Sequence, residues 1–72
     1  MEVGKRYLFM TVTFYWAGTI VSVTPSHATI EKAVLVKDLG EHPMFLEPFP
    51  EQEVVERTVL VALPGTTIIA LG

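Results

Sequence analysis

Ser26 and His27 are the side chains whose types and spacing most readily suggest chemistry. They are adjacent at the end of a short polar segment, Thr24-Pro25-Ser26-His27. A histidine ring can stack on a nucleic-acid base or hydrogen-bond to its edge. Proline and serine are also ordinary turn residues, because proline fixes its own φ and serine bonds the neighbouring backbone. A base-binding histidine and an exposed turn histidine therefore both stay open, and the turn composition favours the second.

The other polar candidates have weaker patterns. Lys5 and Arg6 could contact phosphate, but neighbours on a strand point to opposite faces, which favours a solvated pair. Several carboxylates and one histidine could hold a metal, but they follow no recurring ligand spacing and we interpret them as a solvated acidic loop. These residues are Glu41, His42, Glu47, Glu51 and Glu53.

Catalytic signatures are missing from the sequence. The chain contains no cysteine, so disulfides and thiolate zinc sites are excluded. We find no serine–histidine–aspartate pattern, no glycine-rich phosphate loop and no paired carboxylates. We therefore expect a protein that is not an enzyme and that uses no cofactor and no metal.

Aromatic side chains offer two further possibilities. Phe9, Tyr15 and Trp16 could stack on bases, as aromatic residues of small barrels do. Tyr7, Tyr15 and Trp16 could instead line a peptide groove. The large amount of apolar surface that needs cover favours core or interface packing for all of them.

Composition narrows the class of partner. The chain has 72 residues, a net charge of −3 and only five Lys and Arg residues. This acidic balance argues against binding driven by phosphate contacts, and we expect no DNA partner. No apolar run reaches the roughly 18 residues of a membrane helix, and no cleavable signal follows the basic start. We therefore expect a cytoplasmic protein without a membrane partner.

Strand patterns dominate the chain, which we interpret as one domain over residues 1–72. Gly18 interrupts the alternation and predicts a bulge or sharp bend, and Pro64-Gly65 predicts a turn between the last two strands. Five short strands favour a small, strongly bent barrel of the SH3 or Sm type over a sandwich. We place the strands at 5–15, 19–23, 28–37, 53–63 and 66–71, with a proline-rich loop at 38–52. We expect the apolar triplet Met44-Phe45-Leu46 of that loop to pack on the barrel rim.

The stretch from Val54 to Leu71 is unusually apolar. Only Glu56 and Arg57 are charged within it. A chain of this size buries only about 60% of the surface that its unfolded form exposes, and a core this small rarely supplies more than about 3–5 kcal/mol. We therefore expect a homo-oligomer in which another copy covers part of this stretch.

Two segments carry a family resemblance. Gly18-Thr19-Ile20-Val21-Ser22-Val23, followed after a turn by Ile30-Glu31-Lys32-Ala33, resembles the first motif of the Sm-like family, which includes the Sm/LSm proteins and bacterial Hfq. Leu63-Pro64-Gly65-Thr66-Thr67-Ile68 is similar to the second motif, which joins the last two strands. The stretch from Thr11 to Trp16 also looks like that of short phage-borne proteins.

The resemblance implies an all-β, five-stranded, strongly bent small barrel that assembles into a cyclic ring. The fourth strand of one copy would pair with the fifth strand of the next. The residues at that subunit interface would be Val55, Val59, Val61, Ile68 and Ile69.

The resemblance also implies an RNA site at the loops that face the pore. RNA-binding members of the family use an asparagine after the second strand and an arginine before the last strand. Here His27 falls nearest the asparagine, Pro64 replaces the arginine, and Gly65 matches the family glycine. The implied RNA-binding residues are Ser26, His27, Gly65 and Thr66. Two alternatives stay open: a structural or protein-interaction ring without nucleic acid, and a monomeric SH3-like adaptor that binds a peptide.

Overall fold

The computed structural model describes residues 1–41 and 45–71, which form six β-strands and no helix. All strand pairs are antiparallel, and the sheet order is β4-β3-β2-β1-β6, with β5 also paired to β3. Within the described residues, no segment is a helix long and apolar enough to cross a bilayer. The strands are β1 (Arg6–Met10), β2 (Tyr15–Val23), β3 (His27–Asp38), β4 (Glu51–Val55), β5 (Val59–Ala62) and β6 (Thr67–Ala70).

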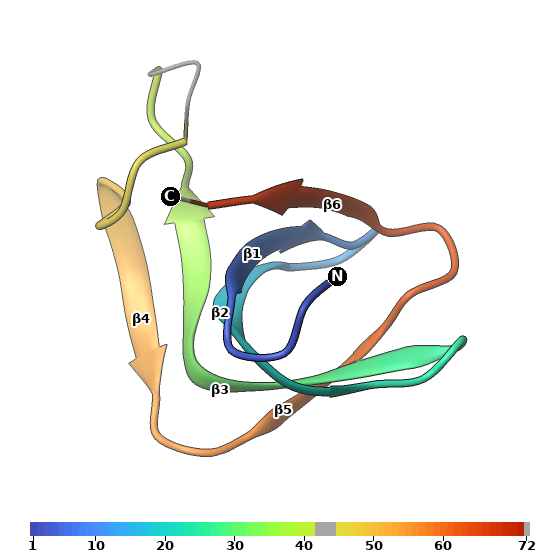
Figure 1. The fold of residues 1–72 in the computed structure, drawn as a ribbon. Coiled ribbons are helices and arrows are strands. Elements are labelled where there is room, and N and C mark those ends of the chain that lie inside the picture. The colour runs from blue at the N-terminus through green and yellow to red at the C-terminus, as the bar shows by residue number, and fades with distance from the viewer. Residues whose placement is uncertain (42–44, 72) are drawn as a thin grey trace.

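The sheet is strongly curved and open. Figure 1 shows β3 bending along its length, so that β4 lies along one half of it and β5 along the other. Among the described residues, no ladder joins β5 to β6, and the sheet does not close into a barrel. The all-β prediction is therefore confirmed, and the observed architecture is an open antiparallel sheet.

The first strand is shorter than expected. The alternation predicts a strand over 5–15, but β1 ends at Met10 and a tight turn follows. The Thr11 hydroxyl accepts a hydrogen bond from the Phe14 amide at 2.9 Å, and the Thr11 amide donates to the Phe14 carbonyl at 3.0 Å. A threonine that bonds nearby backbone competes with strand pairing. The chain therefore reverses direction at a turn that contains no glycine or proline, and β2 begins at Tyr15.

The predicted strand over 53–63 is also wrong in extent, because it is two strands. In the ladders with β3, Ala33 is opposite Val55 and Ile30 is opposite Val59. The segment Glu56-Arg57-Thr58 therefore faces the shorter segment Glu31-Lys32, which is the arrangement of a β-bulge. Bulges bend a strand, so β4 and β5 are two halves of one bent edge. The count of six strands instead of five follows from this break.

Gly18 bends the neighbouring pair of strands, as the sequence predicts. The β2–β3 register shifts between Ala17 and Thr19. A Cβ atom built on Gly18 would lie 2.7 Å from Ile30 Cδ1 and 2.9 Å from Ile30 Cβ. Since Ile30 is completely buried, only glycine allows the two strands to approach this closely.

The core occupies both faces of the central strands. Leu8 and Phe9 are adjacent on β1 and both are completely buried, one in each of two apolar clusters. The chain therefore covers β1 on both faces. The first cluster contains Phe9, Ile20, Ala28, Ile30, Ala33, Val59 and Val61, and the second contains Leu8, Ala17, Val34, Val36 and Phe49.

The loop before β4 covers the second cluster. Phe49 is buried and Phe45 packs against this cluster, whereas Leu46 is exposed. Met44 lies outside the described residues, so the packing expected for the triplet is observed for Phe45 alone.

Arg6 anchors the same loop. Its guanidinium donates to both carboxylate oxygens of Glu47, at 2.8 and 2.7 Å, and also to the Thr19 hydroxyl and the Lys32 carbonyl. Arg6 thus joins β1, β2, β3 and the loop.

Candidate functional site

The two turns singled out by the sequence lie together at one end of the molecule. The Leu63 amide donates to the Ser26 carbonyl at 2.9 Å, and His27 is opposite Ala62 in the β3–β5 ladder. Figure 1 shows the β2–β3 turn and the β5–β6 turn on the same side of the sheet. The structure therefore brings Ser26 and His27 close to the turn that contains Gly65 and Thr66.

Each turn is held by local hydrogen bonds. In the β5–β6 turn, the Thr66 amide donates to the Leu63 carbonyl at 3.0 Å, and Gly65 has a φ of 76°. Proline followed by a left-handed glycine is typical of a type II turn, so the predicted Pro64-Gly65 turn is confirmed. The Thr66 hydroxyl donates to the Ala62 carbonyl at 2.8 Å.

His27 is exposed and takes part in its own turn. Its Nδ1 lies 2.8 Å from the Ser26 hydroxyl. The Thr24 hydroxyl accepts a hydrogen bond from the His27 amide at 3.1 Å. His27 is thus a surface residue, and the carboxylate nearest to it along the chain is that of Glu31.

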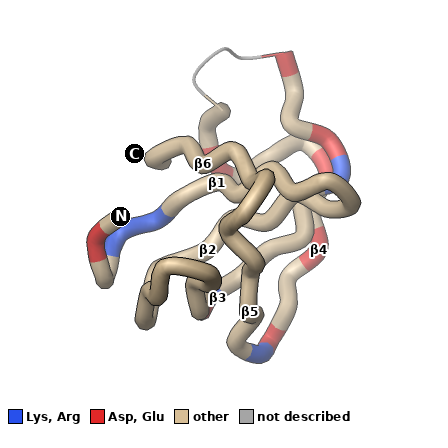
Figure 2. Tube along the Cα trace, turned by 90° about the vertical axis from the view of Figure 1, so that its right-hand side faces the viewer, with Lys and Arg blue, Asp and Glu red and all other residues tan. Residues whose placement is uncertain are grey.

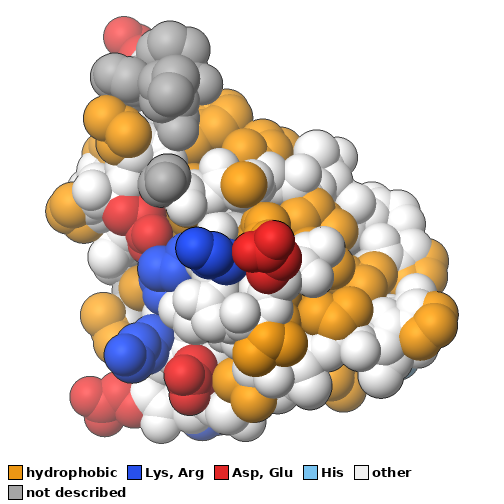
Figure 3. All heavy atoms as spheres, in the orientation of Figure 1, with side chains coloured by type: hydrophobic (Ala, Val, Ile, Leu, Met, Phe, Trp, Pro, Cys, Tyr) orange, Lys and Arg blue, Asp and Glu red, His pale blue; other side chains and the backbone are white. Residues whose placement is uncertain are grey.

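Charge is absent from the parts of the chain that build this end. Every Lys, Arg, Asp and Glu lies within residues 2–6 or 31–57, and residues 7–30 and 58–72 contain none. Figure 2 shows this end facing the viewer with the charged positions at its margins, and Figure 3 shows charged side chains gathered at the left and centre of another face. No lysine or arginine is therefore placed at the two turns to contact phosphate.

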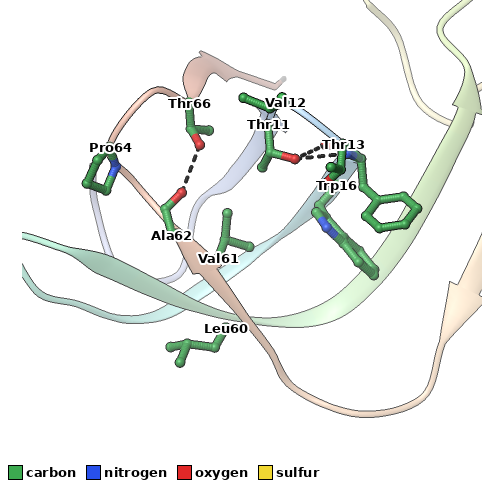
Figure 4. Close-up of a pocket in the computed structure, with 10 residues that line it drawn as sticks. Thr11, Val12, Thr13, Trp16, Leu60, Val61, Ala62, Pro64 and Thr66 are labelled. Carbon is green, nitrogen blue, oxygen red and sulfur yellow. Dashed lines mark hydrogen bonds between the residues drawn. The ribbon is translucent and has the colours of Figure 1, made fainter.

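A hollow of about 320 Å³ lies beside the β5–β6 turn, of which Pro64 and Thr66 line it. It is formed between β5 and the Thr11–Phe14 turn, and Figure 4 shows its lining. The rings of Phe14 and Trp16 meet edge to face with their centroids 6.3 Å apart. Val12, Phe14 and Leu60 are 94%, 54% and 65% exposed. The hollow is thus uncharged and is bordered by apolar side chains that the chain itself does not cover.

The residues expected at a subunit interface lie mostly inside the chain. Val59 and Val61 are buried in the first core cluster, against which Val55 and Ile68 pack. Ile69 packs against the second cluster. The exposed side chains of β5 are Leu60 and Ala62, of which sequence reasoning missed the large one, Leu60. The signal for Leu60 is its position, because successive residues of a strand face opposite sides, so that Leu60 must face solvent when Val59 and Val61 face the core.

The edges of the sheet provide a second kind of candidate site. Within the described chain, β5 pairs only with β3 and β6 only with β1, so each has a free edge. The backbone amides of Leu63 and Leu71 donate hydrogen bonds to the neighbouring strand of the same sheet. In an antiparallel ladder, every second residue bonds to that neighbour and the residues between face away from it. The amides of Leu60 and Ala62 on β5, and those of Ile68 and Ala70 on β6, therefore face away from the sheet. The edge formed by β4 differs, because it carries the exposed Glu51 and Glu53. Charged edge residues discourage pairing with another strand.

The remaining candidates are dispersed. Phe9 is buried and Tyr15 lines a different hollow, with Val36 and Lys37. The hydroxyl of Tyr7 accepts a hydrogen bond from the Glu2 amide. Phe9, Tyr7 and Tyr15 therefore assemble neither the stacking platform nor the peptide groove, the two alternatives to apolar packing.

Two polar sites can also be placed. Arg6 is engaged by Glu47, whereas Lys5 is exposed. Residues 1–41 and 45–71 contain no group of three metal-ligating side chains, and His42 lies outside them.

Comparisons with protein-family models, with curated proteins and with solved structures found no match.

Proposed function

We propose that this chain is a self-assembling module of the Sm-like kind, in which β5 of one copy pairs with β6 of the next and the copies close into a ring. The observation that carries the proposal is that, within the described residues, β5 pairs only with β3 and β6 only with β1, so that one open sheet has two free, uncharged strand edges. An unprotected edge is a template for pairing with another chain. Because the two edges differ, the contact is head to tail, and such contacts form rings when the rotation closes.

Substitutions at an outward-facing amide of β6 test the pairing of β5 and β6 between copies. Ala70→Pro removes one of the outward donors, and Ala70 is exposed, so the core is left intact. Ala70→Val keeps the amide and is the matched control. We expect sedimentation velocity to show an oligomer for the wild type and for Ala70→Val, and a monomer for Ala70→Pro. A wild type that stays monomeric at about 100 µM would contradict the proposal, since specific complexes commonly form well below that concentration.

RNA binding at the two turns is a second candidate function. It is favoured by the hydrogen bond that joins Ser26 to Leu63 and so places His27 near Gly65 and Thr66. A ring would repeat this arrangement around its axis. Labelled oligouridine and oligoadenine, titrated at low and high salt, test the idea, with His27→Ala as the site variant and Glu51→Ala as the control. Failure of both oligonucleotides to bind at low salt would leave a structural ring without nucleic acid, which the uncharged turns favour.

A further inference from the structure

A second hollow lies where the chain passes from β4 to β5. We propose that it binds a small zwitterionic ligand with an apolar side chain, of the class of the apolar α-amino acids. Its volume is about 500 Å³, within the range of roughly 300–1,000 Å³ that is usual for small-molecule sites. No residue of β5 or β6 lines it, so this proposal does not depend on the proposed assembly. We call it the bulge hollow, and its lining consists of Glu31, Lys32, Val34, Val54, Val55, Glu56 and Arg57.

The β-bulge brings charged neighbours to this one hollow. Successive strand residues normally face opposite sides, but Glu31 and Lys32 both line the bulge hollow, as do Glu56 and Arg57. Lys32 has a φ of 49°, in a region that residues other than glycine seldom adopt. Its carbonyl accepts a hydrogen bond at 3.0 Å from the guanidinium of Arg6, which holds this backbone in place. Bulges of this kind redirect side chains beside functional sites.

The floor of the bulge hollow is apolar. Val34 and Val54 are directly opposite each other in the β3–β4 ladder, and Val55 follows Val54 on β4. Val34 is buried, whereas Val54 is 66% exposed. A ligand with an apolar side chain would cover Val54, and removing apolar surface from water is favourable. The floor therefore selects the apolar part of the ligand.

Charges of both signs surround this floor. Glu31 and Lys32 on β3 lie across from Glu56 and Arg57, so each side offers one acid and one base. Figure 3 shows acidic and basic side chains together at the lower left, where Figure 1 shows the chain leaving β4. The ion pairs recorded among the described residues lie elsewhere, so none joins these four exposed side chains to one another.

This charge pattern identifies the polar part of the ligand. An uncharged apolar ligand would remove water from charged side chains without replacing it. A ligand with charge of one sign would meet as many like charges as opposite ones. In a zwitterion, the ammonium group would pair with the carboxylates of Glu31 and Glu56. Its carboxylate would pair with Lys32 and Arg57, and such contacts between charged groups are stronger than neutral hydrogen bonds.

L-Leucine is the probe for the experiment, and methyl NMR of the valine-labelled wild-type protein is the readout. We expect leucine to shift the methyl signals of Val34, Val54 and Val55 saturably, with a Kd in roughly the millimolar range. Leucinamide lacks the carboxylate, 4-methylpentanoate lacks the ammonium group, and glycine lacks the apolar side chain. Each should bind at least about tenfold more weakly. Unchanged valine signals at about 50 mM leucine, or equal binding of any of the three analogues, would overturn the proposal.

Variants of the lining test the residues. Lys32→Gly with Arg57→Gln removes both cations, and glycine adopts the φ of Lys32 readily, so the fold is kept. We expect this double variant to bind leucine at least about tenfold more weakly. Lys5→Gln with Lys37→Gln is the matched control, because it removes the same net charge from exposed positions outside the bulge hollow. Undiminished binding by the first double variant, or an equal loss in the second, would contradict the site. Circular dichroism should show that both variants are folded.

Discussion

Gly18 offers a direct test of how the curved sheet is built. Replacing it with alanine places a methyl group 2.7 Å from Ile30 Cδ1 and 2.9 Å from Ile30 Cβ. Ile30 is completely buried, so it cannot move into solvent to relieve the contact. We expect Gly18→Ala to destabilise the fold.

The magnitude follows from two opposing terms. Overpacking a core by one methyl group costs roughly 1–3 kcal/mol, and the contact with Ile30 Cβ, which is not the flexible end of the side chain, places Gly18→Ala in the upper half of that range. Replacing glycine also reduces the entropy of the unfolded chain, which returns roughly 0.4–1 kcal/mol. The net loss in the free energy of unfolding is about 1–2.6 kcal/mol, which lowers Tm by about 4–20 °C in a domain of this size.

A double-mutant cycle checks the cause. Ile30→Val removes Cδ1 but keeps Cβ, so it should recover part of the loss, about 0.5–1 kcal/mol of coupling. Gly4→Ala is the control, because it meets no atom within 4 Å and is disfavoured only by a φ of 87°. Urea denaturation at one fixed protein concentration measures all the variants. Wild-type stability for Gly18→Ala, or strict additivity with Ile30→Val, would refute this explanation of the bend.

Three further predictions concern the loop, the ion pairs and the neutral contact. Arg6→Lys should lower the free energy of unfolding by about 1 kcal/mol, because lysine keeps the charge but loses the bidentate contact with Glu47. Lys37→Gln breaks the exposed ion pair with Glu53 at 3.4 Å and should cost less than about 0.5 kcal/mol in the same urea assay. Phe49→Ala should cost about 3 kcal/mol, because it empties a buried site under the loop, and a loss below about 1 kcal/mol would contradict the role of Phe49 in the second cluster. Self-association should stay constant or strengthen between roughly 0.05 and 0.5 M NaCl, because screening acts on charges that this contact lacks; dissociation by salt in sedimentation velocity would count against a neutral interface.

Much of the fold could be predicted from local patterns. The bend at Gly18 and the turn at Pro64-Gly65 depend on residues with special backbone freedom, which a sequence displays directly. The strand that became β3 differs by only one residue at each end from its predicted range, because turn and loop residues flank it. Patterns of this kind fail where the structure depends on a residue's distant partner.

The missed features depend on such partners. Thr11 ends β1 through hydrogen bonds to Phe14, although both residues fit the alternation of a strand. The bulge at Glu56-Arg57-Thr58 depends on the spacing of the opposite strand, which no local pattern records.

Only part of the candidate site was visible in the sequence. Its polar residues, Ser26, His27, Gly65 and Thr66, are indeed close together, because two turns were placed correctly. The hollow was not predicted, because it needs the turn at Thr11–Phe14 to face β5 across the open side of the sheet. Val59 and Val61 were expected at an interface because an apolar strand does not reveal which of its faces the chain itself covers.

The mass of the wild-type protein in solution tests the central claim most directly. Light scattering coupled to size-exclusion chromatography should give a single integer multiple of the 8.0 kDa chain over a wide range of protein concentration, as expected for a closed ring. A mass of one chain throughout that range would contradict assembly, and a mass that grows continuously with concentration would contradict closure of the ring.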